Sequence, residues 1–163
     1  MNIRKYLQSG NIIVADGAMG TYYYEKYKDK STLSEKENLG NCELIKKIHI
    51  EYIEAGAKLI RTNSFAANSV NFNKENGELE KVIVNSINTA KEAVSNRKIF
   101  IGASIGPVVL NEDKSENYFK EYKYIVDIFI KNGIDIFLFE TFSSYDKIID
   151  VMRYIKEQKK VAL

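Results

Sequence analysis

Cysteine, histidine and proline each occur only once in this chain of 163 residues, as Cys42, His49 and Pro107. A single cysteine excludes an internal disulfide. One cysteine and one histidine cannot supply the three or four Cys/His ligands of an ordinary zinc site. No apolar run approaches the roughly 18 residues of a membrane span, and the N-terminus, MNIRKYLQSG, lacks the apolar core of a signal peptide. These absences predict a cytoplasmic protein that does not enter a membrane.

An excess of charge of one sign is also lacking. The 24 Lys and Arg residues are nearly balanced by 22 Asp and Glu residues, which leaves a formal net charge of +2. Both signs are interspersed along the chain, so no basic face for nucleic acid or anionic lipid is predicted. The length fits one domain, and the 45% hydrophobic and 28% charged residues are ordinary for a globular protein.

Short apolar segments that run into polar or glycine-bearing turns recur four times along the chain. Such segments are typical of buried strands, which we predict at residues 11–15, 58–61, 99–103 and 134–139. The last residues, 161–163, resemble the beginning of a fifth strand.

Apolar residues at helical spacing lie between these segments. Helices are predicted at about 3–7, 43–55, 78–94, 118–130 and from Ser143 or Ser144, as the N-cap, to about 157. The polar, tyrosine-rich stretch 22–39 is weakly periodic, which favours a long loop with one helical turn.

The alternation of strands and helices predicts an α/β fold made of parallel (β/α) units. Four complete units and the start of a fifth form about half of a TIM-type (β/α)8 barrel, which typically needs about 250 residues. Residues 1–163 are therefore interpreted as one partial barrel domain, truncated near the fifth strand. A complete five-stranded flavodoxin-like fold is the alternative, but it predicts a phosphate-binding turn where Asp16 would repel phosphate.

Polar residues stand where the predicted strands end, and parallel strands bring such ends to one edge. These residues are Asp16, Gly17 and Ala18, then Thr62 and Asn63, Ser104, and Glu140. Asp16 and its small neighbours could bind an ammonium and a carboxylate together. The alternative is a tight turn in which the side chain of Asp16 caps its own backbone. Glu140 follows three apolar residues, where an unpartnered carboxylate is costly to bury. It therefore predicts a cationic ligand group or a bound network.

In their order and spacing these segments resemble a known family. The string DGAMGT, followed by ENLGNCELIKKIHIEYIEAGAKLIRTNSFAAN, IGASIGP and FLFETF, resembles the amino-terminal half of the homocysteine S-methyltransferase family from about Ile12 to Asp146. It is especially similar to the homocysteine-binding module that some bacteria fuse to a methylenetetrahydrofolate reductase. The resemblance implies a (β/α)8 barrel and transfer of a methyl group to the sulfur of homocysteine, which gives methionine.

The resemblance also implies a substrate-binding role for Asp16, Gly17, Ala18, Thr62, Asn63 and Glu140. Asp16 and Glu140 match the carboxylates that hold the amino group of homocysteine. The backbone amides of Gly17 and Ala18 would meet its carboxylate, and the other two residues would line the same mouth. Electrostatics agrees with this assignment, because two carboxylates suit an ammonium and a neutral glycine-bearing turn suits an anion.

Methyl transfer requires a thiolate, and a free thiol with a pKa near about 8.5 is mostly protonated at neutral pH. By this resemblance, zinc held by cysteines of later strands activates the sulfur. Cys42 does not match those cysteines and is interpreted as structural or incidental, and His49 as packed rather than catalytic. Zinc is therefore expected for the complete domain, with its ligands absent from this chain, which we expect to be inactive alone.

Three questions stay open at this level. The methyl donor could be a methylated folate or cobamide, S-methylmethionine or a betaine-like compound. A reductase domain could follow the chain. The alternative from a different class is a noncatalytic binding module that associates with a second copy to cover its open sheet edges.

Overall fold

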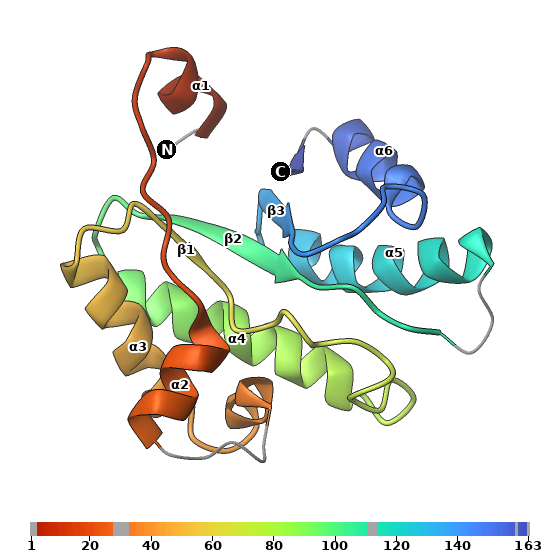
Figure 1. Ribbon diagram of the computed structural model, residues 1–163, viewed down its shortest axis with the longest axis horizontal. Coiled ribbons are helices and arrows are strands. Elements are labelled where there is room, and N and C mark those ends of the chain that lie inside the picture. The colour runs from red at the N-terminus through yellow and green to blue at the C-terminus, as the bar shows by residue number, and fades with distance from the viewer. Residues whose placement is uncertain (1–2, 28–32, 111–113, 159, 163) are drawn as a thin grey trace.

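A computed structural model describes residues 3–27, 33–110, 114–158 and 160–162, and it contains a parallel sheet flanked by helices (Figure 1). The strands follow one another across the sheet as β1 (Leu59–Arg61), β2 (Phe100–Ile105), β3 (Ile136–Phe139) and β4 (Val161–Ala162). Every neighbouring pair is parallel, with Leu59 opposite Phe100 and Gly102 opposite Ile136. The prediction of parallel (β/α) units is confirmed.

The helices connect these strands in the predicted alternation. They are α1 (Ile3–Gln8), α2 (Met19–Tyr27), the 3-10 helix η1 (Ser34–Asn38), α3 (Cys42–Glu54), α4 (Glu78–Val94), α5 (Ser115–Lys131) and α6 (Ile149–Glu157). Gly56 and Gly133 lie just beyond α3 and α5 with φ of 107° and 80°, a conformation that glycine adopts without steric cost. None of the described helices is both long and apolar enough to cross a membrane.

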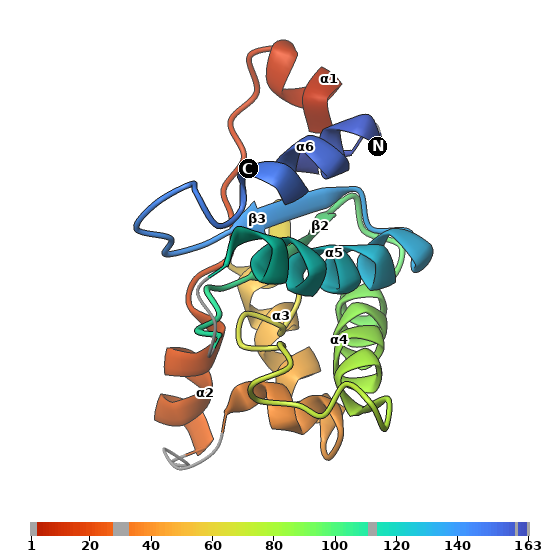
Figure 2. The same cartoon turned by 90° about the vertical axis from the view of Figure 1, so that its right-hand side faces the viewer.

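The outer face of the sheet carries most of the apolar core. Residues of β2 and β3 that alternate along each strand pack against α4, α5 and α6, and Ile87, Phe129, Phe137 and Ile155 in this cluster are fully buried. Figure 2 shows α3, α4 and α5 on this side of the sheet, with α1 on the other side. This burial holds the strand ends in place, because removing apolar surface from water is the main favourable term in folding.

The inner face is divided between an apolar end and a polar end. Ile3 of α1 packs against Leu59, Phe100 and Ile136 at the N-terminal ends of the strands, and the ring of Tyr6 meets that of Phe100 edge-on at 5.5 Å. Inward positions recur every second residue along a strand. Towards the carboxyl ends of the strands, the side chains at these positions become polar. Helix α1 therefore covers one end of this face and leaves the carboxyl end to the site.

The strand predicted at residues 11–15 is wrong as a regular strand. Only Ala15 forms a parallel bridge, to Leu59, supported by Lys58 N–H donating to Val14 O at 2.8 Å and Asp16 N–H donating to Leu59 O at 2.9 Å. Ile12 is 84% exposed and Val14 58% exposed. Among the described residues, the bridge at Ala15 is the one ladder contact of this segment, so it does not form a regular strand.

The long loop predicted at 22–39 is also wrong for most of its described part. Helix α2 covers residues 19–27 and η1 residues 34–38, while 28–32 lie outside the described residues. Tyr23 is buried with Ile45 and Ile48 of α3. Tyrosines supply the apolar face of α2, and a pattern search that counts tyrosine as polar misses them.

The start of the last helix differs from the prediction as well. Helix α6 begins at Ile149, and its N-cap residue, Ile148, makes no side-chain capping hydrogen bond. Ser144 Oγ instead bonds the carboxylate of Asp146 at 2.6 Å. The predicted fifth strand corresponds to β4, although Leu163 lies outside the described residues.

Candidate functional site

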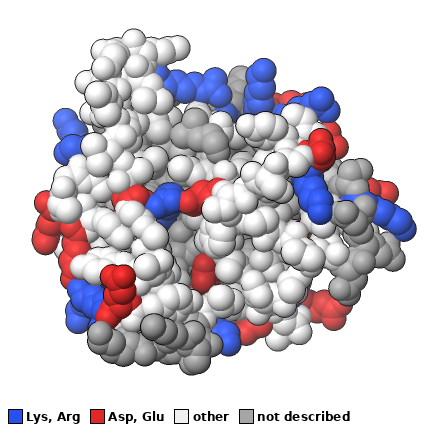
Figure 3. Space-filling model, viewed as in Figure 1, with Lys and Arg blue, Asp and Glu red and all other residues white. Residues whose placement is uncertain are grey.

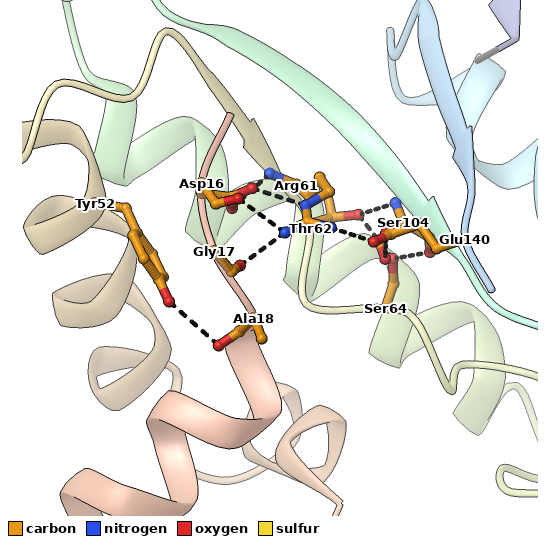
Figure 4. Close-up of polar contacts among 9 residues, drawn as sticks. All are labelled: Asp16, Gly17, Ala18, Tyr52, Arg61, Thr62, Ser64, Ser104 and Glu140. Atoms are coloured by element: carbon orange, nitrogen blue, oxygen red, sulfur yellow. Dashed lines mark hydrogen bonds and ion pairs between the residues drawn. The ribbon is translucent and has the colours of Figure 1, made fainter. Parts of the chain in front are cut away.

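Asp16 and Glu140 meet at one guanidinium, that of Arg61 (Figure 4). Arg61 is the last residue of β1 and points to the inner face, two positions after Leu59. Its Nε donates to Asp16 Oδ1 at 2.8 Å, its backbone N–H donates to Asp16 Oδ2 at 2.9 Å, and one terminal nitrogen donates to Glu140 Oε2. The other terminal nitrogen donates to the carbonyls of Asp16 and Gly17 at 3.0 and 2.7 Å.

The end of β2 holds the second oxygen of Glu140. Ser104 Oγ donates to Glu140 Oε1, and the backbone N–H of Glu140 donates to Ile105 O at 3.0 Å, which continues the ladder past β3. The next residue, Thr141, has φ of 64°, a left-handed conformation that is uncommon for a β-branched side chain. Glu140 is thus held by both of its side-chain oxygens and by its backbone N–H.

A pocket of about 480 Å³ opens beside this cluster. Its lining comes from the ends of β1, β2 and β3, from the first turn of α2 and from η1, and it includes all six predicted substrate-binding residues: Asp16, Gly17, Ala18, Thr62, Asn63 and Glu140. Met19, Tyr24, Leu33 and Phe65 form an apolar part of the wall. Figure 3, which views this face, shows a basic group between acidic groups within a largely uncharged area.

Charges in the pocket oppose one another. Burial raises the pKa of Asp16, the hydrogen bonds and charge of Arg61 act against that rise, and the charge of Glu140 adds to it. Burial disfavours the charge on Arg61, but the hydrogen bonds and charges of Asp16 and Glu140 outweigh it and raise the pKa of this residue. Two carboxylates and one guanidinium leave this cluster with one net negative charge.

Packing against Tyr52 explains why the residue after Asp16 is a glycine. A Cβ on Gly17 would lie 2.8 Å from Tyr52 Oη, and that hydroxyl donates to Ala18 O at 3.2 Å. The pKa of Tyr52 is raised by burial and then by the charge of Asp16. Gly17 therefore lets α3 hold the turn that leads into α2.

Thr62 and Asn63 differ in how far their polar atoms are already used. Thr62 Oγ1 lies 2.7 Å from Ser64 Oγ and accepts from Ser104 N–H at 3.2 Å. The amide of Asn63 donates to Ser34 O at 2.8 Å and to Asn38 Oδ1 at 3.1 Å, and its oxygen accepts from Ser34 Oγ at 2.9 Å. Asn63 thus fastens η1 to the end of β1, which positions the pocket wall.

Arg61 is the residue of this site that the sequence analysis missed. It was assigned only to the end of a strand, although it is the basic residue directly before Thr62. The available signal was alternation: Leu59 is apolar and inward, so Arg61 must face inward too. An inward arginine at a rim that already carries two carboxylates has to pair with them.

Cys42 and His49 both lie on α3, away from the pocket lining. Cys42 Sγ donates to Asn38 O at 3.4 Å, and His49 is fully buried. In the described ranges, no three His, Cys, Asp or Glu residues are grouped so that they could hold a metal ion.

Curated proteins similar in sequence are betaine–homocysteine S-methyltransferases. The Xenopus laevis protein is 25% identical over 165 residues, which cover 94% of this chain and 40% of that protein. The Danio rerio protein is 22% identical over 149 residues, covering 86% of this chain and 37% of that protein. The chain therefore spans about two fifths of the length of these relatives.

Solved structures of the Escherichia coli homocysteine methyltransferase MmuM share the fold. The metallated form superposes with a TM-score of 0.83 at 20% identity and covers 99% of this chain and 65% of the other. The apo form gives 0.76 at 22% identity, covering 98% and 61%. The α/β arrangement with parallel strands corresponds to part of a TIM-type barrel, as predicted. The family model for homocysteine S-methyltransferase matches residues 13–163, so this chain belongs to the homocysteine S-methyltransferase family.

Proposed function

We propose that this chain binds homocysteine as part of a homocysteine S-methyltransferase, with Asp16 and Glu140 accepting hydrogen bonds from the ammonium of the substrate. The methyl group of a donor would pass to the sulfur and give methionine. The observation that carries this proposal is the convergence of the two carboxylates on Arg61 at the edge of one pocket. The net negative charge that remains there suits one ammonium group.

The carboxylate of the substrate has a complementary site at the first turn of α2. The first turn of α2 follows Gly17 and Ala18 and lines the same pocket. Backbone N–H groups at a helix N-terminus lack intrahelical partners and favour anions. A carboxylate bound there would direct the side chain of homocysteine toward the apolar wall. This arrangement supports an α-amino acid with an apolar, sulfur-bearing side chain.

The reaction forms one bond, between sulfur and the methyl carbon, and breaks two, the bond between that carbon and the donor and the S–H bond of the thiol. The sulfur attacks the methyl carbon, the bond between that carbon and the donor breaks with its electron pair leaving on the donor, and the thiol proton is released. Zinc, which the resemblance leads us to expect for the complete domain, lowers the proton affinity of a bound thiol. The described residues do not fit a zinc site, because Cys42 and His49 lie outside the pocket lining. We assign zinc ligation to residues outside this chain.

The role of this chain is then to bind and orient the substrate. We expect it to bind homocysteine but not to form methionine at a robust rate when homocysteine, a methyl donor and zinc are supplied. The methyl donor stays open between a methylated folate or cobamide, S-methylmethionine and a betaine-like compound. A downstream reductase domain is also a proposal. A cytoplasmic location also stays a prediction.

Calorimetric titration with L-homocysteine tests the binding proposal. Asp16→Asn and Glu140→Gln each remove one charged acceptor of the ammonium, and such hydrogen bonds contribute about 1.5–3 kcal/mol. We expect affinity to fall roughly 10- to 100-fold in each variant. Removing the ammonium from the ligand, as in 4-mercaptobutyrate, should weaken binding to the unmodified chain to a similar extent.

Glu116→Gln is the matched control, because Glu116 is an exposed carboxylate paired with Lys120 on α5. It should leave the affinity unchanged. The proposal fails if 4-mercaptobutyrate binds as tightly as homocysteine, or if Glu140→Gln and Glu116→Gln behave alike while both variants keep the circular dichroism spectrum of the parent chain.

A further inference from the structure

Arg61 occupies the place where two carboxylates would otherwise face each other without a cation. The side chain of Asp16 is only 2% exposed, and those of Arg61 and Glu140 are each 21% exposed. Two carboxylates that share a partly buried site cannot both ionise easily, and the usual result is that one of them binds a proton. A protonated carboxyl group would lose its charge and much of its attraction for an ammonium.

The guanidinium is fixed in a way that makes it part of the site rather than a passing surface partner. Its nitrogens bond carboxylate oxygens on Asp16 and Glu140 and two backbone carbonyls, those of Asp16 and Gly17. The planar fork of arginine suits this geometry, whereas the ammonium of lysine is a point charge. Arg61 thereby connects the turn before α2 to the end of β3.

The surrounding titratable groups do not replace this cation. Tyr52 of α3 approaches from the side of Ala18, Tyr24 of α2 lines the pocket, and Glu35 of η1 adds a further carboxyl group. Glu35 accepts a hydrogen bond from Ala66 N–H at 2.9 Å. Among the described residues that line the pocket, Arg61 is the only lysine or arginine.

Resting on the proposed function, we propose that Arg61 is a positioning residue that keeps Asp16 and Glu140 ionised together and leaves one net negative charge for the single ammonium of the substrate. Arg61 then acts through the carboxylates and does not itself bind the ammonium. Without it we expect the pair to share a proton at higher pH than in the parent, so that the pH dependence of amino-acid binding moves to higher pH.

The test is a carbon NMR titration of the side-chain carboxyl groups in the chain without ligand. In Arg61→Gln we expect one of the two carboxyl resonances to titrate at least one pH unit higher than in the parent, and in Arg61→Lys we expect an intermediate shift. The resonances are assigned with Asp16→Asn and Glu140→Gln. Because no substrate is present, this result judges Arg61 even if homocysteine does not bind and the proposed function fails.

Two results would overturn the proposal: carboxyl titrations that are unchanged in Arg61→Gln, or homocysteine binding that becomes tighter in that variant. Tighter binding would mean that Arg61 only competes with the ammonium. If Arg61→Gln does not fold, Glu140→Gln in the presence of Arg61 gives the answer. Asp16 should then titrate at lower pH than in the parent, because the neighbouring negative charge is gone, and an unchanged titration would reject the coupling on which the proposal depends.

Discussion

Two buried ionisable side chains, Asp16 and His49, are stabilised in opposite ways. Burial raises the pKa of Asp16, and hydrogen bonds from Arg61 act against that rise. His49 is fully buried in α3, and neither of its ring nitrogens has a hydrogen-bond partner in the part of the chain that the structure describes. Burial therefore lowers the pKa of His49 to about 4, so the folded chain keeps this imidazole neutral.

This histidine should make stability depend on pH. The pKa in the folded chain, about 4, is below the value of roughly 6.5 for an unfolded chain. The unfolded chain therefore binds more protons between these values, and the contribution of His49 is complete above the upper value and is lost as pH falls toward the lower one. We expect about 2 kcal/mol less free energy of unfolding at pH 5 than at pH 7 from this residue.

Urea unfolding of the parent and of His49→Leu at both pH values measures this effect. Leucine has a similar volume and no titrating group, so the difference between the two pH values should shrink by about 2 kcal/mol in the variant. Equal losses in parent and variant would show that another group is responsible.

Single residues explain which parts of the site could be predicted. Asp16 and Glu140 were expected at a common rim because each directly follows an apolar segment, and both do contact Arg61. Asn63 was expected to line the mouth, and it lines the pocket with an amide already bonded to Ser34 and Asn38. Local sequence cannot reveal such partners, because η1 reaches the site through tertiary packing.

At the scale of secondary structure, the residue that follows β2, Gly106, is in close contact with the backbone of Phe65. Gly106 N–H donates to Phe65 O at 2.9 Å, and a Cβ on this glycine would lie 2.6 Å from the same oxygen and 2.7 Å from the ring of Phe65. Phe65 is part of the pocket wall. The two loops can approach this closely only because residue 106 has no side chain.

Gly106→Ala should therefore destabilise the chain by about 1–3 kcal/mol, as expected for an overpacked site. Thermal unfolding followed by circular dichroism measures the loss. Gly40→Ala is the comparison, since the nearest atom to a Cβ at residue 40 lies 3.7 Å away, and we expect it to change stability by no more than about 0.5 kcal/mol. Similar effects of both substitutions would contradict the packing argument.

Regular elements were predictable where one periodicity dominates. Helix α4 has the predicted bounds, 78–94, because its apolar residues keep helical spacing throughout. Residues 11–15 have the composition of a buried strand, but Ile12 and Val14 are exposed. Whether a strand forms there depends on pairing and packing with segments distant in the sequence, which composition does not encode.

At the scale of the whole molecule, the sheet has edges. The segment before Asp16 pairs only with β1, and β4 pairs only with β3, among the described residues. Unpaired strand edges are templates for pairing with another chain. Self-association through such edges stays a prediction for this chain, and it does not exclude membership of the methyltransferase family.

We expect sedimentation velocity to detect association that increases with concentration. Val14→Lys should weaken it, because a lysine on an edge opposes strand pairing. Val70→Lys is the matched control, since Val70 is 60% exposed and Val14 58% exposed, yet Val70 lies in the loop between β1 and α4. A parent chain that stays monomeric, or an equal effect of both lysines, would argue against pairing through this edge.

The division of the inner face has a consequence for how such a domain can change. The apolar contacts of α1 with the beginnings of the strands involve none of the residues that line the pocket at their far ends. Substitutions at the rim can therefore alter which molecule is bound without loosening the contacts beneath α1. The apolar packing and the ligand-binding residues lie at opposite ends of the same strands. The ligand-binding residues can therefore diverge while the packing residues stay unchanged.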